Sequence, residues 1–202
     1  GEKIYYPLDE NLECENIVIY VMRGLEWSEA LHGYAIQNKN KVTESEMKNV
    51  YCNPSSPCYE IGEETKSLSE QLWNGCGGGK AEYVDVVYRY LVEMEYDYEL
   101  KNSPDREPWV EYCTSMDLDF VLKKNKALCR EKANLMAALL RMRGIPCKVI
   151  VGIVSEGMET GHAWNEVYIN NEWVCFDTTN SLNGNVVKER EELKSFIEYW
   201  CY

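Results

Sequence analysis

Three residues in the second half of the chain have the types and the order that catalysis by a thiol requires: Cys129, His162 and Asp177. A thiolate is the nucleophilic form of cysteine, an imidazole can accept and return its proton, and a carboxylate can orient the imidazole. The corresponding chemistry is attack on a carbonyl, followed by a thioester acyl-enzyme. Each residue also has an ordinary explanation, as a core thiol, a strand histidine or a turn-capping aspartate. The conjunction of the three favours catalysis.

The stretch around Cys129 predicts a helix that carries the thiol at its N-terminus. Apolar residues recur through it at helical spacing: Ala133, Met136, Ala137 and Leu140. Gly144 followed by Pro146 is a strong stop signal, so we expect the helix to span about 128–143. A helix N-terminus lowers the pKa of a thiol, and its unpaired amides can bind a developing oxyanion.

Strands are predicted after this helix, over about 146–154, 162–169 and 172–177. The last two are joined by Asn170 and Asn171, a pair that tolerates the left-handed geometry of a two-residue hairpin loop. A helix followed by an antiparallel sheet is an α+β arrangement.

The hairpin makes a prediction about the distance between His162 and Asp177. If the loop has two residues, Ile169 pairs with Glu172, and His162 becomes the diagonal neighbour of Asp177 on one face of the sheet. A slip of one residue would place the two side chains on opposite faces. The register therefore allows a His-Asp pair.

The remainder of the chain gives weaker signals. Residues 81–97 predict an amphipathic helix, and residues 187–200 predict a short helix with Leu193, Phe196, Ile197 and Trp200 facing inward. Thr43 and Glu46 form a capping-box pattern for another short helix. The glycine-rich stretch 74–80 predicts a flexible boundary between two parts of the chain. We therefore expect a partly helical N-terminal extension over 1–80 and the core over 81–202, together forming one compact unit.

Composition excludes some functions and leaves the compartment open. The net charge of −13 repels phosphate backbones, so nucleic acid is not an expected partner, and no apolar stretch is long enough to span a membrane. Setting Cys129 aside leaves eight cysteines, an even number that favours disulfides and a secreted or envelope protein, although buried thiols in a cytoplasmic protein are the alternative. Cys52 and Cys58 could close one small disulfide loop. The start at Gly1 favours a removed leader or a trimmed chain.

No metal or cofactor is expected. The sequence has no C-x-x-C pair, only two histidines and no calcium-loop pattern of the Asp-x-Asx-x-Asx-Gly type.

Two stretches resemble the core of the transglutaminase-like superfamily, a papain-like group of cysteine enzymes: LCREKANLMAALLRMRGIPCKVIVG (128–152) and GHAWNEVYINNEWVCFDTT (161–179). The family pattern is Gly-x-Cys-x-x-x-Ala, Arg-x-x-Gly-Ile-Pro, His-Ala-Trp and Asp-x-Thr. The resemblance implies that Cys129 is the nucleophile, His162 the base and Asp177 the third member. Ala127 replaces the usual glycine. A second oxyanion donor has no clear motif here, and the candidates are Gln71, Trp73 and Tyr98.

The resemblance also implies a peptide or protein substrate whose amide carbonyl is attacked. Water resolves the thioester in a peptidase or deamidase, whereas a lysine-type amine resolves it in a transglutaminase. We favour a peptidase, because water is always available. The alternatives are a protein-glutamine transglutaminase or deamidase, a non-catalytic binding module, and an extracellular domain in which Cys129 is disulfide-bonded. The oligomeric state is not predicted.

Overall fold

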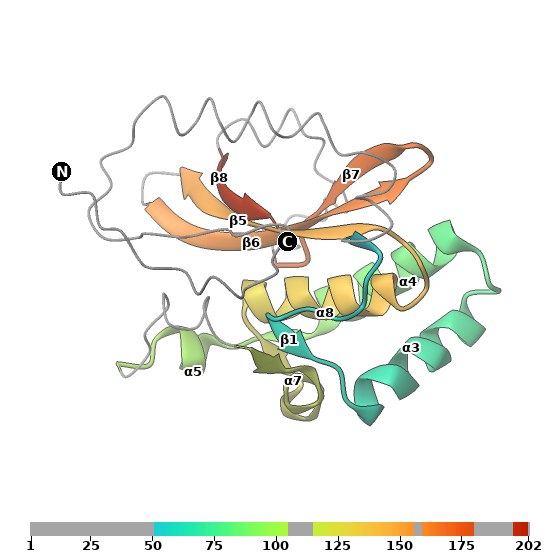
Figure 1. The fold of residues 1–202 in the computed structure, drawn as a ribbon. Helices are drawn as coiled ribbons and strands as arrows, with labels where there is room; N and C mark the ends of the chain where they lie inside the picture. Colours follow the sequence, from blue (N-terminus) through green and yellow to red (C-terminus); the bar gives the residue numbers. More distant parts are fainter. Residues whose placement is uncertain (1–50, 105–114, 156–158, 180–195, 202) are drawn as a thin grey trace, which may run out of the picture.

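The structure, a computed structural model, describes residues 51–104, 115–155, 159–179 and 196–201 (Figure 1). Its helices are α3 (Glu63–Gly75), α4 (Lys80–Glu93), α5 (Tyr98–Lys101), α7 (Leu118–Lys124) and α8 (Cys129–Arg141). Its short strands are β1 (Tyr59–Glu60), β2 (Glu95–Tyr96), β3 (Met116–Asp117) and β4 (Lys126–Ala127). The main sheet contains β5 (Cys147–Ser155), β6 (Glu159–Ile169), β7 (Glu172–Phe176) and β8 (Phe196–Cys201).

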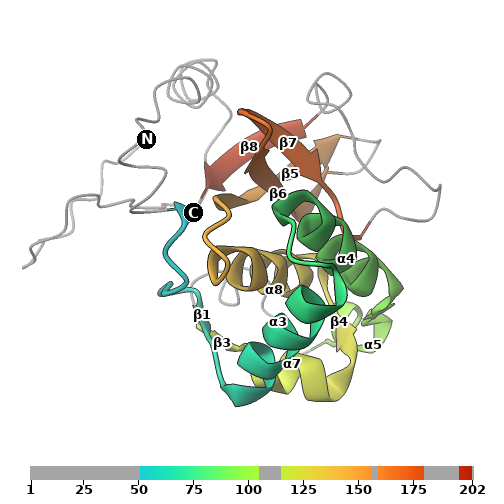
Figure 2. The same cartoon turned by 90° about the vertical axis from the view of Figure 1, so that its right-hand side faces the viewer.

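Helix α8 lies at the centre, between the sheet and the other helices (Figures 1 and 2). Its apolar side chains are fully buried, among them Leu135, Met136, Leu139 and Leu140. Because α8 has neighbours on nearly every side, several of its polar residues are buried as well, among them Lys132, Asn134 and Arg141. At its C-terminal end Gly144 has a φ of 61°, and the N–H of Ile145 donates to the carbonyl of Leu140. This left-handed stop is the one that the sequence predicts.

The main sheet is antiparallel, with the order β7-β6-β5-β8. Asn170 and Asn171 both have positive φ values, of 53° and 67°, and Ile169 pairs with Glu172. The predicted hairpin and its register are therefore confirmed. The helical layer beside an antiparallel sheet also confirms the α+β class.

The prediction of a helix over 187–200 is wrong for residues 196–200, which belong to the strand Phe196–Cys201. This strand, β8, pairs with β5 (Figure 1). The segment Phe-Ile-Glu-Tyr-Trp-Cys is rich in aromatic and β-branched residues, which favour strands, and β5 offers it an open hydrogen-bonding edge. Residues 187–195 of that predicted helix, and the predicted helix near Thr43, lie outside the described residues.

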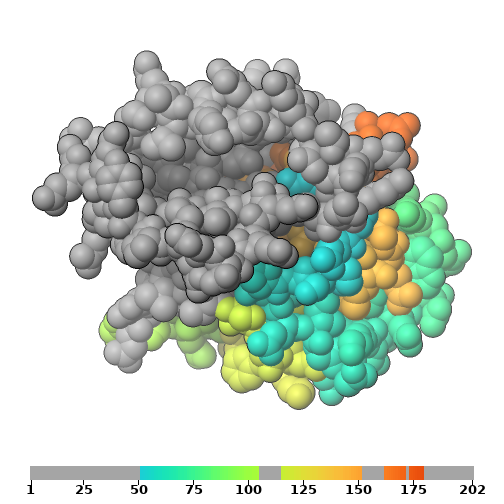
Figure 3. Space-filling model, in the orientation of Figure 1, coloured from blue at the N-terminus to red at the C-terminus, as the bar shows by residue number. Residues whose placement is uncertain are grey.

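The core begins before the glycine-rich stretch 74–80. Tyr59 is buried in the same hydrophobic cluster as α8, and α3 packs against both α4 and α8. In the space-filling view, the start of the described chain, α3 and α7 form one continuous surface (Figure 3). The division at residue 80 stays a prediction, since residues 1–50 lie outside the described part of the chain.

The N-terminus of α3 is capped from a distant part of the chain. Asp119, on α7, accepts hydrogen bonds from the N–H groups of Glu64 and Thr65 at 3.0 and 2.9 Å, and from the Thr65 hydroxyl at 2.7 Å. Burial raises the pKa of Asp119, but these hydrogen bonds outweigh burial and hold the pKa below its ordinary value. The carboxylate thus fastens α3 to α7.

Two expectations concern disulfides and membranes. No disulfide joins any two of Cys52, Cys58, Cys76, Cys129, Cys147 and Cys175, so the suggested loop closed by Cys52 and Cys58 is not formed in the described part of the chain. Among the residues that the structure describes, no helix is long and apolar enough to cross a lipid bilayer.

Candidate active site

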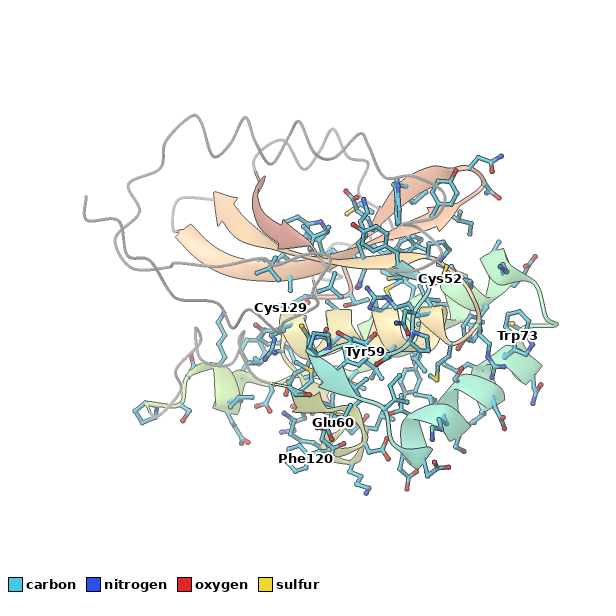
Figure 4. All side chains as sticks on the ribbon, viewed as in Figure 1. Cys52, Tyr59, Glu60, Trp73, Phe120 and Cys129 are labelled. Carbon is cyan, nitrogen blue, oxygen red and sulfur yellow. The ribbon has the colours of Figure 1, made fainter. Side chains whose placement is uncertain are left out.

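Cys129, His162 and Asp177 come together from three different elements. Cys129 is the first residue of α8, His162 lies on β6, and Asp177 follows directly after β7. The His162 Nε2 atom lies 2.8 Å from Asp177 Oδ2, and the His162 side chain is also hydrogen-bonded to Cys129. Figure 4 shows Cys129 at the end of α8, close beneath the sheet. All three predicted residues therefore meet at one place.

The start of α8 is fixed one residue before the thiol. The carboxylate of Glu131 accepts a hydrogen bond from the N–H of Leu128 at 2.7 Å, which is one half of a capping box. This contact holds the first turn of α8 in place, with Cys129 as the first residue of the helix.

The surroundings of Cys129 stabilise its anion. The side chain is only 8% exposed, and its sulfur accepts hydrogen bonds from His162 and from the backbone N–H groups of Ala163 and Arg130. Burial raises the pKa of the thiol, but the hydrogen bond and charge of His162 and the two backbone donors outweigh burial, so the net effect lowers the pKa.

His162 is stabilised in its charged form. Burial lowers the pKa of its imidazole, whereas the hydrogen bonds and negative charges of Asp177 and Cys129 raise the pKa to about 10. Since Nε2 faces Asp177, Nδ1 is the ring nitrogen left for Cys129. A lowered thiol pKa beside a raised imidazole pKa favours a thiolate–imidazolium pair over the neutral pair.

Asp177 and the ring of His162 are each held by further contacts. Asp177 Oδ1 accepts a hydrogen bond from the N–H of Thr179 at 2.9 Å, which closes an Asx turn. The hydroxyl of Tyr88 donates to the carbonyl of Asp177 at 3.3 Å. Trp164 stacks on His162, with the ring centroids 5.9 Å apart and the planes at 26°. These contacts leave the imidazole little freedom to rotate.

Asn165 joins the nucleophile helix to the sheet. Its Nδ2 atom donates to the carbonyl of Ala133 on α8 at 2.9 Å and to the carbonyl of Lys148 on β5 at 3.1 Å. Ala133 lies one helical turn after Cys129, so these hydrogen bonds fix the distance between the start of α8 and β6, and with it the position of the thiol.

The three candidates for a second oxyanion donor lie in different places. Trp73 is 5.5 Å from the Arg143 guanidinium, just past the C-terminal end of α8, and Figure 4 shows it far from Cys129. Gln71 is exposed in a surface hollow lined also by Tyr90 and Leu122. Tyr98 is exposed but packs on Tyr96, a residue that pairs with Ala127 just before α8. Only Tyr98 therefore lies on a segment beside the candidate nucleophile.

Sequence reasoning missed two of the groups around the thiol. The N–H of Arg130 was foreseeable as a first-turn amide of the predicted helix, since such amides lack helical acceptors. The N–H of Ala163 carries no sequence signal, because its approach to Cys129 depends on how β6 crosses the end of α8. The described residues contain no cluster of three or more His, Cys, Asp or Glu side chains that could hold a metal ion.

Comparison with known proteins places these residues in a family. The model of the transglutaminase-like superfamily matches residues 66–178, more than half of the 202-residue chain and all three candidate residues. No curated protein matches the chain.

Three solved structures resemble the chain at low identity. A candidate cysteine protease from Cytophaga hutchinsonii is 21% identical with a TM-score of 0.46, and the match covers 75% of this chain and 51% of that one. A TGase is 24% identical with a TM-score of 0.46, covering 80% and 40%. A candidate protease from Parabacteroides distasonis is 17% identical with a TM-score of 0.44, covering 57% and 23%. The chain thus spans about half or less of the length of these proteins.

Proposed function

Because the chain belongs to the transglutaminase-like superfamily, a group typically made of cysteine-dependent enzymes, we propose that it attacks amide carbonyls of peptides or proteins with the thiolate of Cys129. His162 is the general base and acid, and Asp177 orients His162 and stabilises its cation. One observation carries this proposal: a single imidazole bonds to both the buried thiol and a buried carboxylate, the latter at 2.8 Å.

The reaction follows from the resting ion pair. The Cys129 thiolate attacks the carbonyl carbon, and the negative charge moves to the carbonyl oxygen, where the first-turn N–H of Cys129 is suited to bind it. The His162 imidazolium gives its proton to the departing amine, and the carbon–nitrogen bond breaks to leave a thioester. His162, now neutral, takes a proton from water as the water attacks the thioester. The acid product leaves and the ion pair is restored.

Hydrolysis and amine transfer share every step up to the thioester. In a transglutaminase a lysine-type amine replaces the water, and the same three residues serve both outcomes. We favour a peptidase, because water needs no binding site of its own. A non-catalytic module is the rival from another class, and the contacts that hold Cys129, His162 and Asp177 in a reactive arrangement count against it.

The experiment measures the rate at which iodoacetamide alkylates Cys129 between pH 4 and 9, in the wild type and in His162→Ala, with peptide mapping to separate the nine cysteines. A free thiol with a pKa of about 8.5 is only about 0.3% ionised at pH 6. We therefore expect Cys129 of the wild type to label at pH 6 nearly as fast as at pH 8, and the His162→Ala rate at pH 6 to fall about 100-fold. Cys76, which caps the C-terminus of α3, is the internal reference, since its rate should not depend on His162.

Labelling that follows an ordinary thiol titration in both proteins would rule out the ion pair, and with it the catalytic proposal. If the ion pair is found, peptide substrates are tested with and without added lysine-type amine. If the acyl group is released as a carboxylic acid even when the amine is present, the result supports a peptidase. If the acyl group is recovered as an amide of the added amine, the result supports a transglutaminase.

A further inference from the structure

Lys132 is a buried lysine one turn after the candidate nucleophile. It lies on α8, is only 3% exposed, and has no carboxylate within salt-bridge distance among the described residues. Its Nζ atom donates instead to the carbonyl of Met94, directly after α4, at 2.6 Å, and to the carbonyl of Thr178 at 3.5 Å. The ammonium thus connects the nucleophile helix, the end of α4 and the segment that carries Asp177.

The position of Asp177 depends on such anchors. The last paired residues of the hairpin are Asn165 and Phe176, so Asp177 lies beyond the backbone ladder that orders β6 and β7. Two successive carbonyls hold its turn to the helices: that of Asp177 accepts from Tyr88 on α4, and that of Thr178 accepts from Lys132 on α8. The carboxylate that faces His162 is therefore located by the helical layer as well as by the sheet.

Lys132 balances the charges of the three candidate catalytic residues. A thiolate, an imidazolium and a carboxylate sum to one negative charge, and burying a net charge is costly. Lys132 interacts electrostatically with Asp177 and brings the sum to zero. Burial lowers the pKa of Lys132, and Asp177 opposes this, leaving the pKa at about 8, so the ammonium is mostly charged at neutral pH.

Other ionisable groups near Lys132 have partners elsewhere or stay neutral. On α8, Glu131 bonds to Leu128 N–H and to Lys124 of α7. On the segment after α4, Asp97 pairs with the same Lys124 at 3.0 Å. On α4, burial raises the pKa of Tyr88, so its hydroxyl is neutral over the working range.

We propose that Lys132 is a positioning residue for the candidate triad. It holds the Asp177 turn against the nucleophile helix, and it supplies the positive charge that balances Asp177, so that the Cys129–His162 ion pair forms at neutral pH. This inference rests on the proposed function and adds a fourth residue to it. A purely structural lysine would contribute to stability without affecting the ionisation of Cys129, and that difference can be measured.

The test compares Lys132→Met with Lys148→Met as a matched control. Lys148 is equally buried, at 3% exposure, and bonds to Glu166 at 3.2 Å, but Glu166 lies four residues along β6 from His162, or about 13 Å. Both variants remove a buried ammonium, and only Lys132→Met removes it beside Asp177. The readouts are the pH midpoint of Cys129 alkylation and the urea midpoint of unfolding.

Removing a positive charge makes the thiolate less favourable, so we expect Lys132→Met to raise the midpoint of Cys129 alkylation by about one pH unit, with roughly tenfold slower labelling at pH values below the wild-type midpoint. Lys148→Met should leave the labelling midpoint unchanged although it lowers stability. Lys132→Arg, which keeps the charge, should restore a midpoint close to that of the wild type. If Lys132→Met does not fold, Lys132→Gln gives the same readout, since it keeps an N–H donor and removes the charge.

A folded, uncharged variant with the wild-type labelling midpoint would overturn the inference and leave Lys132 a structural residue. That result differs from failure of the proposed function, in which the wild type itself titrates as an ordinary thiol and His162→Ala has no effect.

Discussion

The charge state of His162 is the property on which the candidate site depends most. Its pKa rises from an ordinary 6.5 to about 10 although burial opposes the rise. Asp177 and Cys129 supply the rise together, and the contribution of Asp177 is the larger. Loss of the larger cause should lower the pKa of His162 by at least about one unit, and one pKa unit corresponds to about 1.4 kcal/mol. In Asp177→Asn the pKa of His162 should therefore fall clearly below about 10.

The sequence makes this measurement simple, because the chain contains only two histidines. In a His32→Gln background, His162 gives the only imidazole signals in the NMR spectrum, and their shift can be followed from pH 5 to 11. Asp97→Asn is the matched control. Asp97 is also a buried aspartate, but it accepts from the N–H of Leu100 and pairs with Lys124, so its loss should leave the titration of His162 unchanged.

Two results would refute this reasoning. His162 titrating near 6.5 in the wild type would mean that burial dominates and that no ion pair exists. An unchanged pKa of about 10 in Asp177→Asn would mean that the 2.8 Å contact does not determine the charge of the imidazole.

Two further predictions concern the helical layer. Asp119→Ala should lower the free energy of unfolding by about 1–2 kcal/mol at pH 7, because it uncaps α3. Since the pKa of Asp119 is lowered by folding, its contribution is present above pH 3.8 and is lost as the pH falls through its folded-state pKa, so urea unfolding of wild type and variant should converge in acid. Leu139→Ala should cost about 2–5 kcal/mol, because Leu139 is fully buried in α8. Phe120→Ala removes a side chain that is 62% exposed, so it should change the urea midpoint of unfolding little. If Phe120→Ala and Leu139→Ala lowered the midpoint equally, the assignment of Leu139 to the buried core would be wrong.

Local signals made the central elements predictable. Gly144 adopts a left-handed conformation that ends α8, and the hydrogen bond there joins residues close together in the sequence. Asn170 and Asn171 both tolerate positive φ values, and this local property favours a two-residue loop. The register of the hairpin then follows, because each residue pair is fixed once the loop is fixed. The meeting of His162 and Asp177 is a consequence of that register, whereas their catalytic role stays a prediction.

Contacts between distant segments were not predictable in this way. The residues of β8 suit either a helical or an extended periodicity, and the partner strand β5 decides between them from far along the chain. Lys132 is one of several charged residues in the first turns of α8, and only the folded structure shows that it points to two backbone carbonyls. Asp119 likewise looks like a first-turn acid of its own helix, although it caps a different helix.

The place of β8 in the sheet affects the order in which the chain can fold. Phe196 pairs with Val154, 42 positions earlier, whereas β5, β6 and β7 follow one another along the chain. During synthesis the segments that bear Cys129, His162 and Asp177 leave the ribosome before β8 does, and pairing between nearby segments costs less loop-closure entropy. Until β8 arrives, β5 exposes unpaired backbone groups that a neighbouring nascent chain could also bind. Pairing of β8 therefore covers the edge of β5 through which two unfinished chains could associate.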